Sequence, residues 1–312
     1  MGFHSVEAIE DAVERTKDIV LPFDLLTWTK LAVIILFLGG AGFSTFFFNF
    51  PFTTFTGFEE SSTSIQSPTG FESAFQAQTG SPELVMPALG IGMFVISVAA
   101  IGLIIAMYPN SLAEFVMFGS VESRDVQLRD NISSYFVDAV KYSLFKAVYG
   151  LLVVGLLIAW LGSFAVQPII GLLLTAVFIP LMILVMVFGV LVHDFVLLKI
   201  IRGQKGFIEA VQSVFRTVRV EWREVGVYIV VRVVISWAVG LMSLTVIGSV
   251  SLLFILVFGV LMLVLGLFSP ILAAVPALLG LILWVITLLY LVVPFRTYMF
   301  SFFVEVYMRI FE

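Results

Sequence analysis

The chain has 312 residues, of which 61% are hydrophobic and 12% charged, and its formal net charge is −5. A soluble domain carries about 25% charged residues, and a soluble core of this size cannot hide so much apolar side chain, because a folded surface must meet water. The composition therefore excludes an ordinary soluble protein and gives no reason to expect nucleic-acid binding. The absence of cysteine excludes disulfides, thiol nucleophiles and Cys-ligated metals.

Charge is distributed unevenly along the chain. Three gaps contain no Lys or Arg: Lys30 to Arg124, Lys146 to Lys199, and Arg232 to Arg296. A spanning helix needs roughly 20 mostly apolar residues, and lipid cannot hydrogen-bond a bare backbone, so such runs must form helices or a closed barrel. The run 169–192 lacks the polar and apolar alternation of barrel strands. We therefore predict an all-α, polytopic transmembrane helical bundle with amphipathic interfacial helices.

Residues 1–26 are predicted to hold an N-terminal amphipathic interfacial helix. Within 5–20, Val6, Ile9, Val13 and Val20 fall on one helical face, and acidic and basic side chains surround it. The helix ends before Pro22, because proline disfavours helix in the preceding residue. We expect it to lie on the membrane surface; packing against the rest of the protein is an equally weighted alternative.

Residues 27–312 are predicted to form a single transmembrane domain of about six spans, with seven as the alternative. The predicted spans are 27–48, 84–107, 142–163, 169–197, 224–248 and 273–295. Residues 49–83 form a polar loop that we expect to be extracellular. The apolar segment 249–272 is predicted to be broken or re-entrant, because a full span there would place Arg296 and Arg309 outside, against the positive-inside rule.

Residues 206–222 are predicted to form a basic amphipathic helix on the cytoplasmic side. Such helices lie against anionic leaflets, so we expect contact with anionic lipid head groups, although an ordinary positive-inside anchor has the same composition. The candidate contacts are the basic residues of this region: Lys199, Arg202, Lys205, Arg216, Arg219 and Arg223. The same rule places the N-terminus in the cytoplasm.

The chain also carries a family resemblance in three stretches. They are Ala8-Ile9-Glu10-Asp11-Ala12 followed by Leu21-Pro22-Phe23, then Asp194-Phe195-Val196 followed by Gly206, and Val293-Pro294-Phe295 followed by Thr297-Tyr298. In their order and spacing these resemble a family of uncharacterised polytopic membrane proteins of haloarchaea. The second stretch is more distantly similar to the membrane domain of glycerophosphoryl diester phosphodiesterases. The resemblance implies a multi-pass protein of the archaeal plasma membrane, and it implies no activity and no functional residues.

The candidate polar or transport site consists of His193, Asp194 and Arg232. His193 and Asp194 lie at the end of the predicted span 169–197, and Arg232 lies about two turns into the next span, where antiparallel packing would bring it to Asp194. Ionisable groups in membranes are costly and often functional. A structural ion pair is the alternative, and it is the more frequent role of a single buried pair.

No enzymatic motif is found in the sequence, so we expect no catalytic residues, no cofactor and no metal. The first functional hypothesis is a non-enzymatic scaffold that organises the envelope or supports a membrane-protein partner. The alternative is a transporter or lipid-handling protein with a polar site between the spans 169–197 and 224–248. A dry helical bundle would favour the scaffold, and a lined polar cavity would favour the alternative.

Overall fold

The computed structural model describes residues 4–21, 23–38, 107–203 and 206–311, and in these ranges all regular structure is helical, as the sequence predicts. A helix over residues 107–123 precedes α6. The labelled elements are α1 (His4–Val20), α2 (Leu25–Phe37), α6 (Leu128–Val166), α7 (Pro168–Leu191), η1 (Val192–Val196), α8 (Leu197–Gly203), α9 (Phe207–Val220), α10 (Trp222–Gly266) and α11 (Pro270–Phe311). The predicted loop 49–83, nearly all of the span 84–107 and the second half of the span 27–48 lie outside the described residues.

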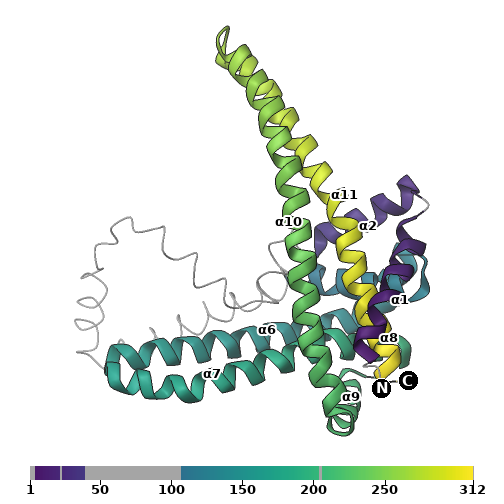
Figure 1. Cartoon of the computed structure of the whole chain (residues 1–312), viewed down its shortest axis with the longest axis vertical. Helices are drawn as coiled ribbons and strands as arrows, with labels where there is room; N and C mark the ends of the chain where they lie inside the picture. Colours follow the sequence, from purple (N-terminus) through teal and green to yellow (C-terminus); the bar gives the residue numbers. More distant parts are fainter. Residues whose placement is uncertain (1–3, 22, 39–106, 204–205, 312) are drawn as a thin grey trace, which may run out of the picture.

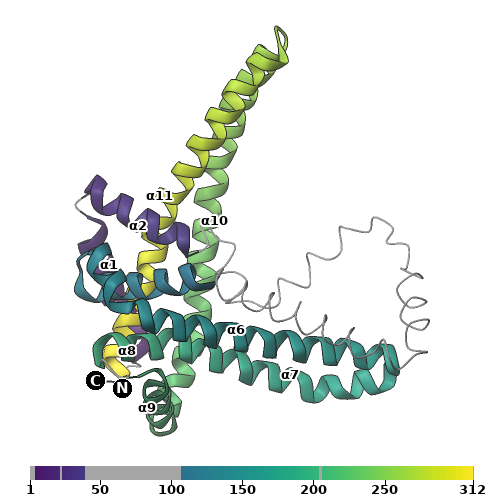
Figure 2. The ribbon, with the colours of Figure 1, turned by 180° about the vertical axis from the view of Figure 1, so that it is seen from behind.

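Two long helical hairpins extend from a shared base (Figure 1). α6 and α7 turn at Gln167, and Pro168 begins α7, where a missing N–H and a fixed φ suit the first helical turn. α10 and α11 turn at 267–269, and Pro270 begins α11 in the same way. Seen from either side, the α10–α11 hairpin follows the long axis of the molecule and the α6–α7 hairpin runs across it (Figure 2).

Each hairpin contains an indole hydrogen bond between its two helices. Trp160 Nε1 donates to Thr175 Oγ1 at 2.9 Å in the α6–α7 hairpin, and Trp284 Nε1 donates to Ser251 Oγ at 3.0 Å in the α10–α11 hairpin. Polar side chains in apolar surroundings need a partner, and hydrogen bonds between helices supply one. These bonds therefore fix the helix pairing within each hairpin.

Within the segment 249–272, predicted to be broken or re-entrant, the helix α10 of 45 residues continues to Gly266, and the chain turns only at 267–269. A single glycine costs a helix only about 1 kcal/mol relative to alanine, whereas an unpaired backbone in lipid costs several. Gly248 and Gly259 therefore do not interrupt α10. At about 1.5 Å per residue α10 is about 68 Å long, roughly twice the apolar thickness of a bilayer.

Four helical stretches in the described residues are long and apolar enough to cross a membrane, or up to five if the bent pair α1–α2 counts as one span. They are Leu128–Phe164, Pro168–Gly203, Trp222–Gly266 and Ile271–Phe311. We call residues 147–191 and 233–295 the two arms of the molecule. Neither arm contains a charged residue, and both expose many large apolar side chains. These features are compatible with a polytopic membrane protein.

The base contains the buried core of the described chain. It consists of α1, α2, the helix 107–123, η1, α8, α9 and the adjoining ends of α6, α10 and α11. α1 packs along the C-terminal part of α11, and Arg15 of α1 forms a buried ion pair with Glu305 of α11, with Nε 2.5 Å from Oε1. The N-terminal helix therefore packs on the rest of the protein, which is the alternative weighed from the sequence.

The buried face of α1 differs from the predicted one. Ser5, Ala8, Ala12, Arg15 and Ile19 are buried, at helical spacing, whereas Val6 and Val13 are 50% and 39% exposed. Of the predicted apolar face, Val20 is buried and Ile9 packs against the core, whereas Val6 and Val13 do not take part in the packing. Small alanine side chains allow the α1 backbone to approach α11 closely, and larger valines would hold the two helices apart.

Candidate functional site

The π-helical turn η1 places a buried carboxylate, Asp194, at the junction of the two hairpins. The side chain is 0% exposed, and Tyr228 of α10 donates to its Oδ2 at 2.5 Å. Arg232, one turn further along α10, lies with Nε 2.5 Å from Oδ2 and donates from Nη2 to Oδ1 at 3.2 Å. The contact expected between Asp194 and Arg232 is therefore present. π-helical turns are rare and frequently occur at functional sites.

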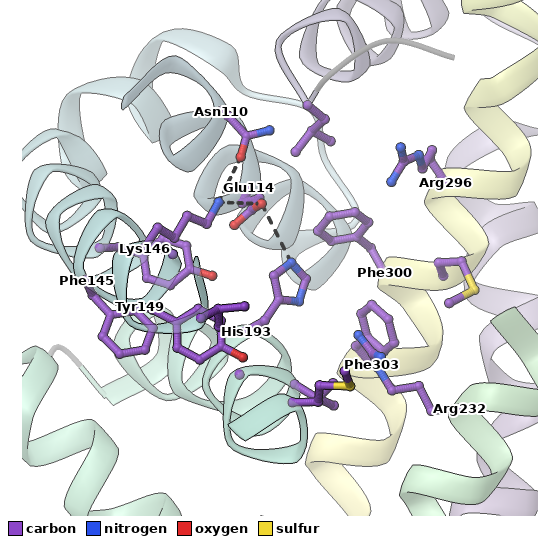
Figure 3. A pocket seen from close by; sticks show the side chains of 18 of the residues that line it. Asn110, Glu114, Phe145, Lys146, Tyr149, His193, Arg232, Arg296, Phe300 and Phe303 are labelled. Carbon is purple, nitrogen blue, oxygen red and sulfur yellow. Dashed lines mark hydrogen bonds and ion pairs between the residues drawn. The ribbon is translucent and has the colours of Figure 1, made fainter. Parts of the chain in front are cut away.

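His193 connects Asp194 to a second buried cluster. Its Nδ1 lies 2.6 Å from Asp194 Oδ1, and since an ionised carboxylate only accepts hydrogen bonds, Nδ1–H is the donor. Its Nε2 lies 3.7 Å from Oε1 of Glu114, which comes from the helix 107–123. Lys146 of α6 donates to the same oxygen at 2.7 Å and to Asn110 Oδ1 at 2.8 Å (Figure 3).

Glu114 lies outside the four candidate spans and stays ionised in the folded protein. Burial by itself would raise the pKa of this carboxyl, but the charges of Lys146 and then His193, with hydrogen bonds from both, outweigh burial and lower the pKa to about 2. The carboxylate therefore carries its charge at any physiological pH, and it needs these cations to do so.

A cavity of about 280 Å³ lies beside this cluster. Six polar side chains line it: Asn110, Glu114, Lys146, His193, Arg232 and Arg296. Apolar side chains line it as well, among them Val153, Val154, Met182 and Met186 of the α6–α7 hairpin. The cavity thus combines charged and apolar side chains, as a site for an amphipathic ligand does.

Arg296 of α11 gives the cavity an excess of positive charge. Lys146 is matched by Glu114, and Arg232 is matched by Asp194. Arg296 has a buried Nη2 that finds no hydrogen-bond partner among the described residues, and in Figure 3 it lies across the cavity from Lys146. The charge that acts on Arg296 is that of Glu114, which already pairs with Lys146. Burying a cation with so little compensation is costly, so an anion in this cavity would stabilise Arg296.

The predicted site residues take different places in this arrangement. His193 and Arg232 line the cavity, and Asp194 lies behind them as their buried partner. Sequence reasoning missed Asn110, Glu114, Lys146 and Arg296. Glu114 and Lys146 could have been found as single charged residues within apolar runs, Leu112–Phe118 and Leu144–Tyr149.

Of the six basic residues predicted to contact anionic lipid, the five in the described part of the chain have different surroundings. Lys199 Nζ and the Arg202 guanidinium lie 6.0 and 5.8 Å from the centroid of the Tyr307 ring, and Arg202 Nε is also 3.0 Å from Glu122 Oε1. Lys205 lies outside the described residues. The remaining three are exposed: Arg216, Arg219 and Arg223. The apolar face of α9 packs on the core through Ala210 and Val214, so it is not available for insertion into a leaflet.

These features define the class of the protein: an all-helical chain with several candidate membrane spans and a charged, amphipathic cavity where two helical hairpins meet. The family model that matches residues 3–311 is described as a family of unknown function, DUF7544. The chain therefore belongs to the DUF7544 family. No curated protein and no solved structure matched it.

Proposed function

We propose that this chain is a lipid-handling membrane protein that binds an amphiphile with an anionic head group in the cavity between its two hairpins. The observation that carries the proposal is the cavity itself, in which Lys146 and Arg296 face the same space as Val153 and Met186. From the sequence, a helical bundle without a polar cavity would favour the scaffold, and a lined polar cavity would favour a transporter or lipid-handling protein. The cavity therefore supports lipid handling over the scaffold.

The charge of the cavity supports an anionic head group. Glu114 pairs with Lys146 and Asp194 pairs with Arg232, so the positive charges in excess are those of Arg296 and of His193 when it is protonated. Arg296 is offset by the charge of Glu114, which Lys146 also shares, and its Nη2 has no hydrogen-bond partner among the described residues. Charge-assisted hydrogen bonds from arginine to phosphate or carboxylate are among the strongest in proteins. Burying such a ligand therefore stabilises both partners.

The apolar side chains of the lining support an acyl or isoprenoid chain on the ligand. Met182 and Met186 of α7 and Val153 and Val154 of α6 all line the cavity, and Val154 is 51% exposed. Methionine adapts to chains of different shape. A chain bound here would continue along the apolar surface of the arm, where the surrounding lipid would cover it.

For the cellular arrangement we propose a multi-pass protein of the plasma membrane with a cytoplasmic base. The uncharged arms and the basic residues of the base support this orientation under the positive-inside rule. The N-terminus would then be cytoplasmic, because α1 belongs to the base. The resemblance to haloarchaeal membrane proteins and to the phosphodiesterase membrane domain agrees with this placement and stays a prediction. We propose a non-enzymatic binding function.

The scaffold remains a second proposal, supported by the length of the α10–α11 arm. Its apolar surface extends to Leu267 and Phe268 at the tip, and two helices of 45 and 42 residues exceed what one bilayer covers. A membrane-protein partner along this arm would cover the excess apolar surface.

The test of the lipid-handling proposal is the content of co-purified lipid. The full chain would be purified from membranes in mild detergent, and bound lipid would be quantified by mass spectrometry for the wild type, Arg296→Gln and the control Arg216→Gln. We expect a retained anionic amphiphile that falls several-fold in Arg296→Gln and is unchanged in the control, because Arg216 is exposed on α9.

Arg296→Gln also keeps the test interpretable. Arg296 Nη2 has no hydrogen-bond partner among the described residues, and removing a buried cation that is weakly compensated costs the folded state little, so the variant should keep its thermal stability. Equal lipid content in all three proteins, or no lipid above the level of the surrounding detergent, would contradict the proposal.

A further inference from the structure

We infer that the head group bound in this cavity is a phosphate monoester, which carries close to two negative charges at neutral pH, rather than a singly charged phosphodiester. The inference rests on the proposed lipid-handling function and names the class of anionic lipid. It comes from the way in which two buried carboxylates, those of Glu114 and Asp194, are shared among the basic side chains around the cavity.

Three basic side chains share the carboxylate of Glu114. Lys146 donates to its Oε1 at 2.7 Å, His193 Nε2 lies 3.7 Å from the same oxygen, and the charge of Glu114 also acts on Arg296. The Tyr142 hydroxyl hydrogen-bonds this carboxylate as well, and it contributes a donor without adding a charge. One negative charge therefore serves three basic side chains.

Two basic side chains share the carboxylate of Asp194. Arg232 contacts both of its oxygens, and His193 Nδ1 lies 2.6 Å from Oδ1. The His193 ring thus turns one nitrogen toward Asp194 and the other toward Glu114. A neutral imidazole would direct a lone pair at one of these carboxylates, whereas an imidazolium presents an N–H to each. The two carboxylates therefore favour the protonated form of His193.

The charges around the cavity then leave an excess of two positive charges. Among the described side chains that line the cavity, together with Asp194 behind them, the cations are Lys146, Arg232, Arg296 and protonated His193, and the anions are Glu114 and Asp194. Buried charges are tolerated when they are paired. A singly charged head group would leave one positive charge uncompensated, whereas a doubly charged phosphate would match the excess.

The shape of the site agrees with a compact phosphate. The four basic side chains come from α6, η1, α10 and α11 and line one cavity of about 280 Å³ (Figure 3). Ligand sites are usually about 300–1,000 Å³, so this one holds a small head group and the start of a chain. A phosphate monoester offers three terminal oxygens as strong acceptors, and cations on different helices can donate to different oxygens.

The test is a series of head groups on identical chains, in which charge and size change separately. Phosphatidic acid carries close to two negative charges at about pH 7.5, and its methyl and ethyl esters carry one charge and differ from each other only in size. Binding of each lipid to the full chain in detergent micelles would be measured by native mass spectrometry. We expect the methyl ester to bind about tenfold more weakly than phosphatidic acid, and the ethyl ester to bind about as well as the methyl ester.

Variants assign this preference to the excess charge. Arg296→Gln and His193→Gln each remove one positive charge, so each should bring the affinity ratio between phosphatidic acid and its methyl ester toward one. Arg296→Lys keeps the charge and should keep the ratio, and so should Arg216→Gln, because Arg216 is exposed on α9. Since the wild-type series needs no mutation, the inference stays testable if His193→Gln does not fold.

The outcomes separate the inference from the proposed function. Equal binding of phosphatidic acid and its esters, or a loss from methyl to ethyl as large as the loss at the first ester, would overturn the inference and leave lipid binding standing. An unchanged ratio in Arg296→Gln would overturn it in the same way. Failure of every lipid to bind would overturn the proposed function as well.

Discussion

The charged side chain of Asp194 is completely buried, and contacts with three neighbouring side chains offset the free-energy cost of burying it. Tyr228, Arg232 and His193 all contact its two oxygens. Breaking a buried ion pair from one side is far more costly than replacing both partners, because it leaves one charge without compensation. The pair therefore has a structural role that does not depend on whether the cavity beside it binds a ligand.

Asp194→Asn should accordingly destabilise the protein by about 3–5 kcal/mol, because it leaves Arg232 buried without its counter-charge. Thermal or denaturant unfolding in detergent would measure the loss. Asp130→Asn, at an exposed aspartate near the start of α6, is the matched control. The double variant Asp194→Asn with Arg232→Gln should cost less than the sum of the two single changes. Additive effects would show that the two side chains are not coupled.

The lowered pKa of Glu114 predicts how the stability of the folded protein depends on pH. Its pKa is about 2 in the folded protein, below the value of 4.5 for a free glutamate, because its cationic neighbours outweigh burial. A group with a lowered folded-state pKa stabilises the fold above its unfolded pKa, and this contribution is lost as the pH falls. We therefore expect the Glu114 contribution to be complete above about pH 4.5 and lost progressively toward pH 2.

The measurement is the melting temperature of the wild type and of Glu114→Gln over the range from pH 6 to pH 2. The stability difference between the two proteins should shrink in the acid part of this range. A difference that stays constant down to pH 2 would contradict the assigned environment of this carboxylate.

At the scale of elements, close contacts within the arms depend on particular glycines. A Cβ built on Gly280 of α11 would lie 2.6 Å from Cγ of Phe258 on α10, whereas one on Gly259 would meet nothing within 4 Å. Gly280→Ala should therefore destabilise the protein by about 1–3 kcal/mol, because the ring of Phe258 must move. Gly259→Ala should be neutral or stabilising by up to about 1 kcal/mol, because alanine favours helix. Unfolding of both variants in detergent measures this difference, and equal effects would argue against the pairing of α10 with α11.

The sequence predicted the helices far better than their ends and contacts. The uncharged stretch from Arg232 to Arg296 indicates helix throughout, but nothing local distinguishes Gly259, inside α10, from Gly266, at its end. The turn depends instead on the Ser269-Pro270 pair that begins α11. Similarly, the face of α1 that contacts α11 is set by small residues, which a hydrophobic pattern passes over.

The contacts of the candidate site were likewise predicted only in part. The Asp194–Arg232 contact was predicted, but from antiparallel packing of two spans. In the structure α8 and α9 lie between η1 and α10 in the chain, and α7 runs across α10 (Figure 1). The Glu114–Lys146 pair requires the helix 107–123 to pack against α6 with these two residues level with each other. The position of Arg296 requires α11 to pass the same cavity. Such arrangements depend on the packing of the whole base, which no local pattern encodes.

At the scale of the whole molecule, the two hairpins diverge from the base (Figures 1 and 2), and residues of both line the cavity. Its walls come from α6, α7, η1, α10 and α11 together with the helix 107–123. Any change in the angle between the hairpins would therefore change the cavity.

Site-resolved photo-crosslinking would show whether an amphiphile occupies this cavity. A phospholipid with a photoreactive group near its head group would be added to the full chain in membranes, and the labelled peptides would be mapped by mass spectrometry. We expect labelling at the cavity-lining residues Tyr149, Met186 and Met299, reduced several-fold in Arg296→Gln. Labelling spread only along the outward faces of the two arms, with none at these residues, would contradict it.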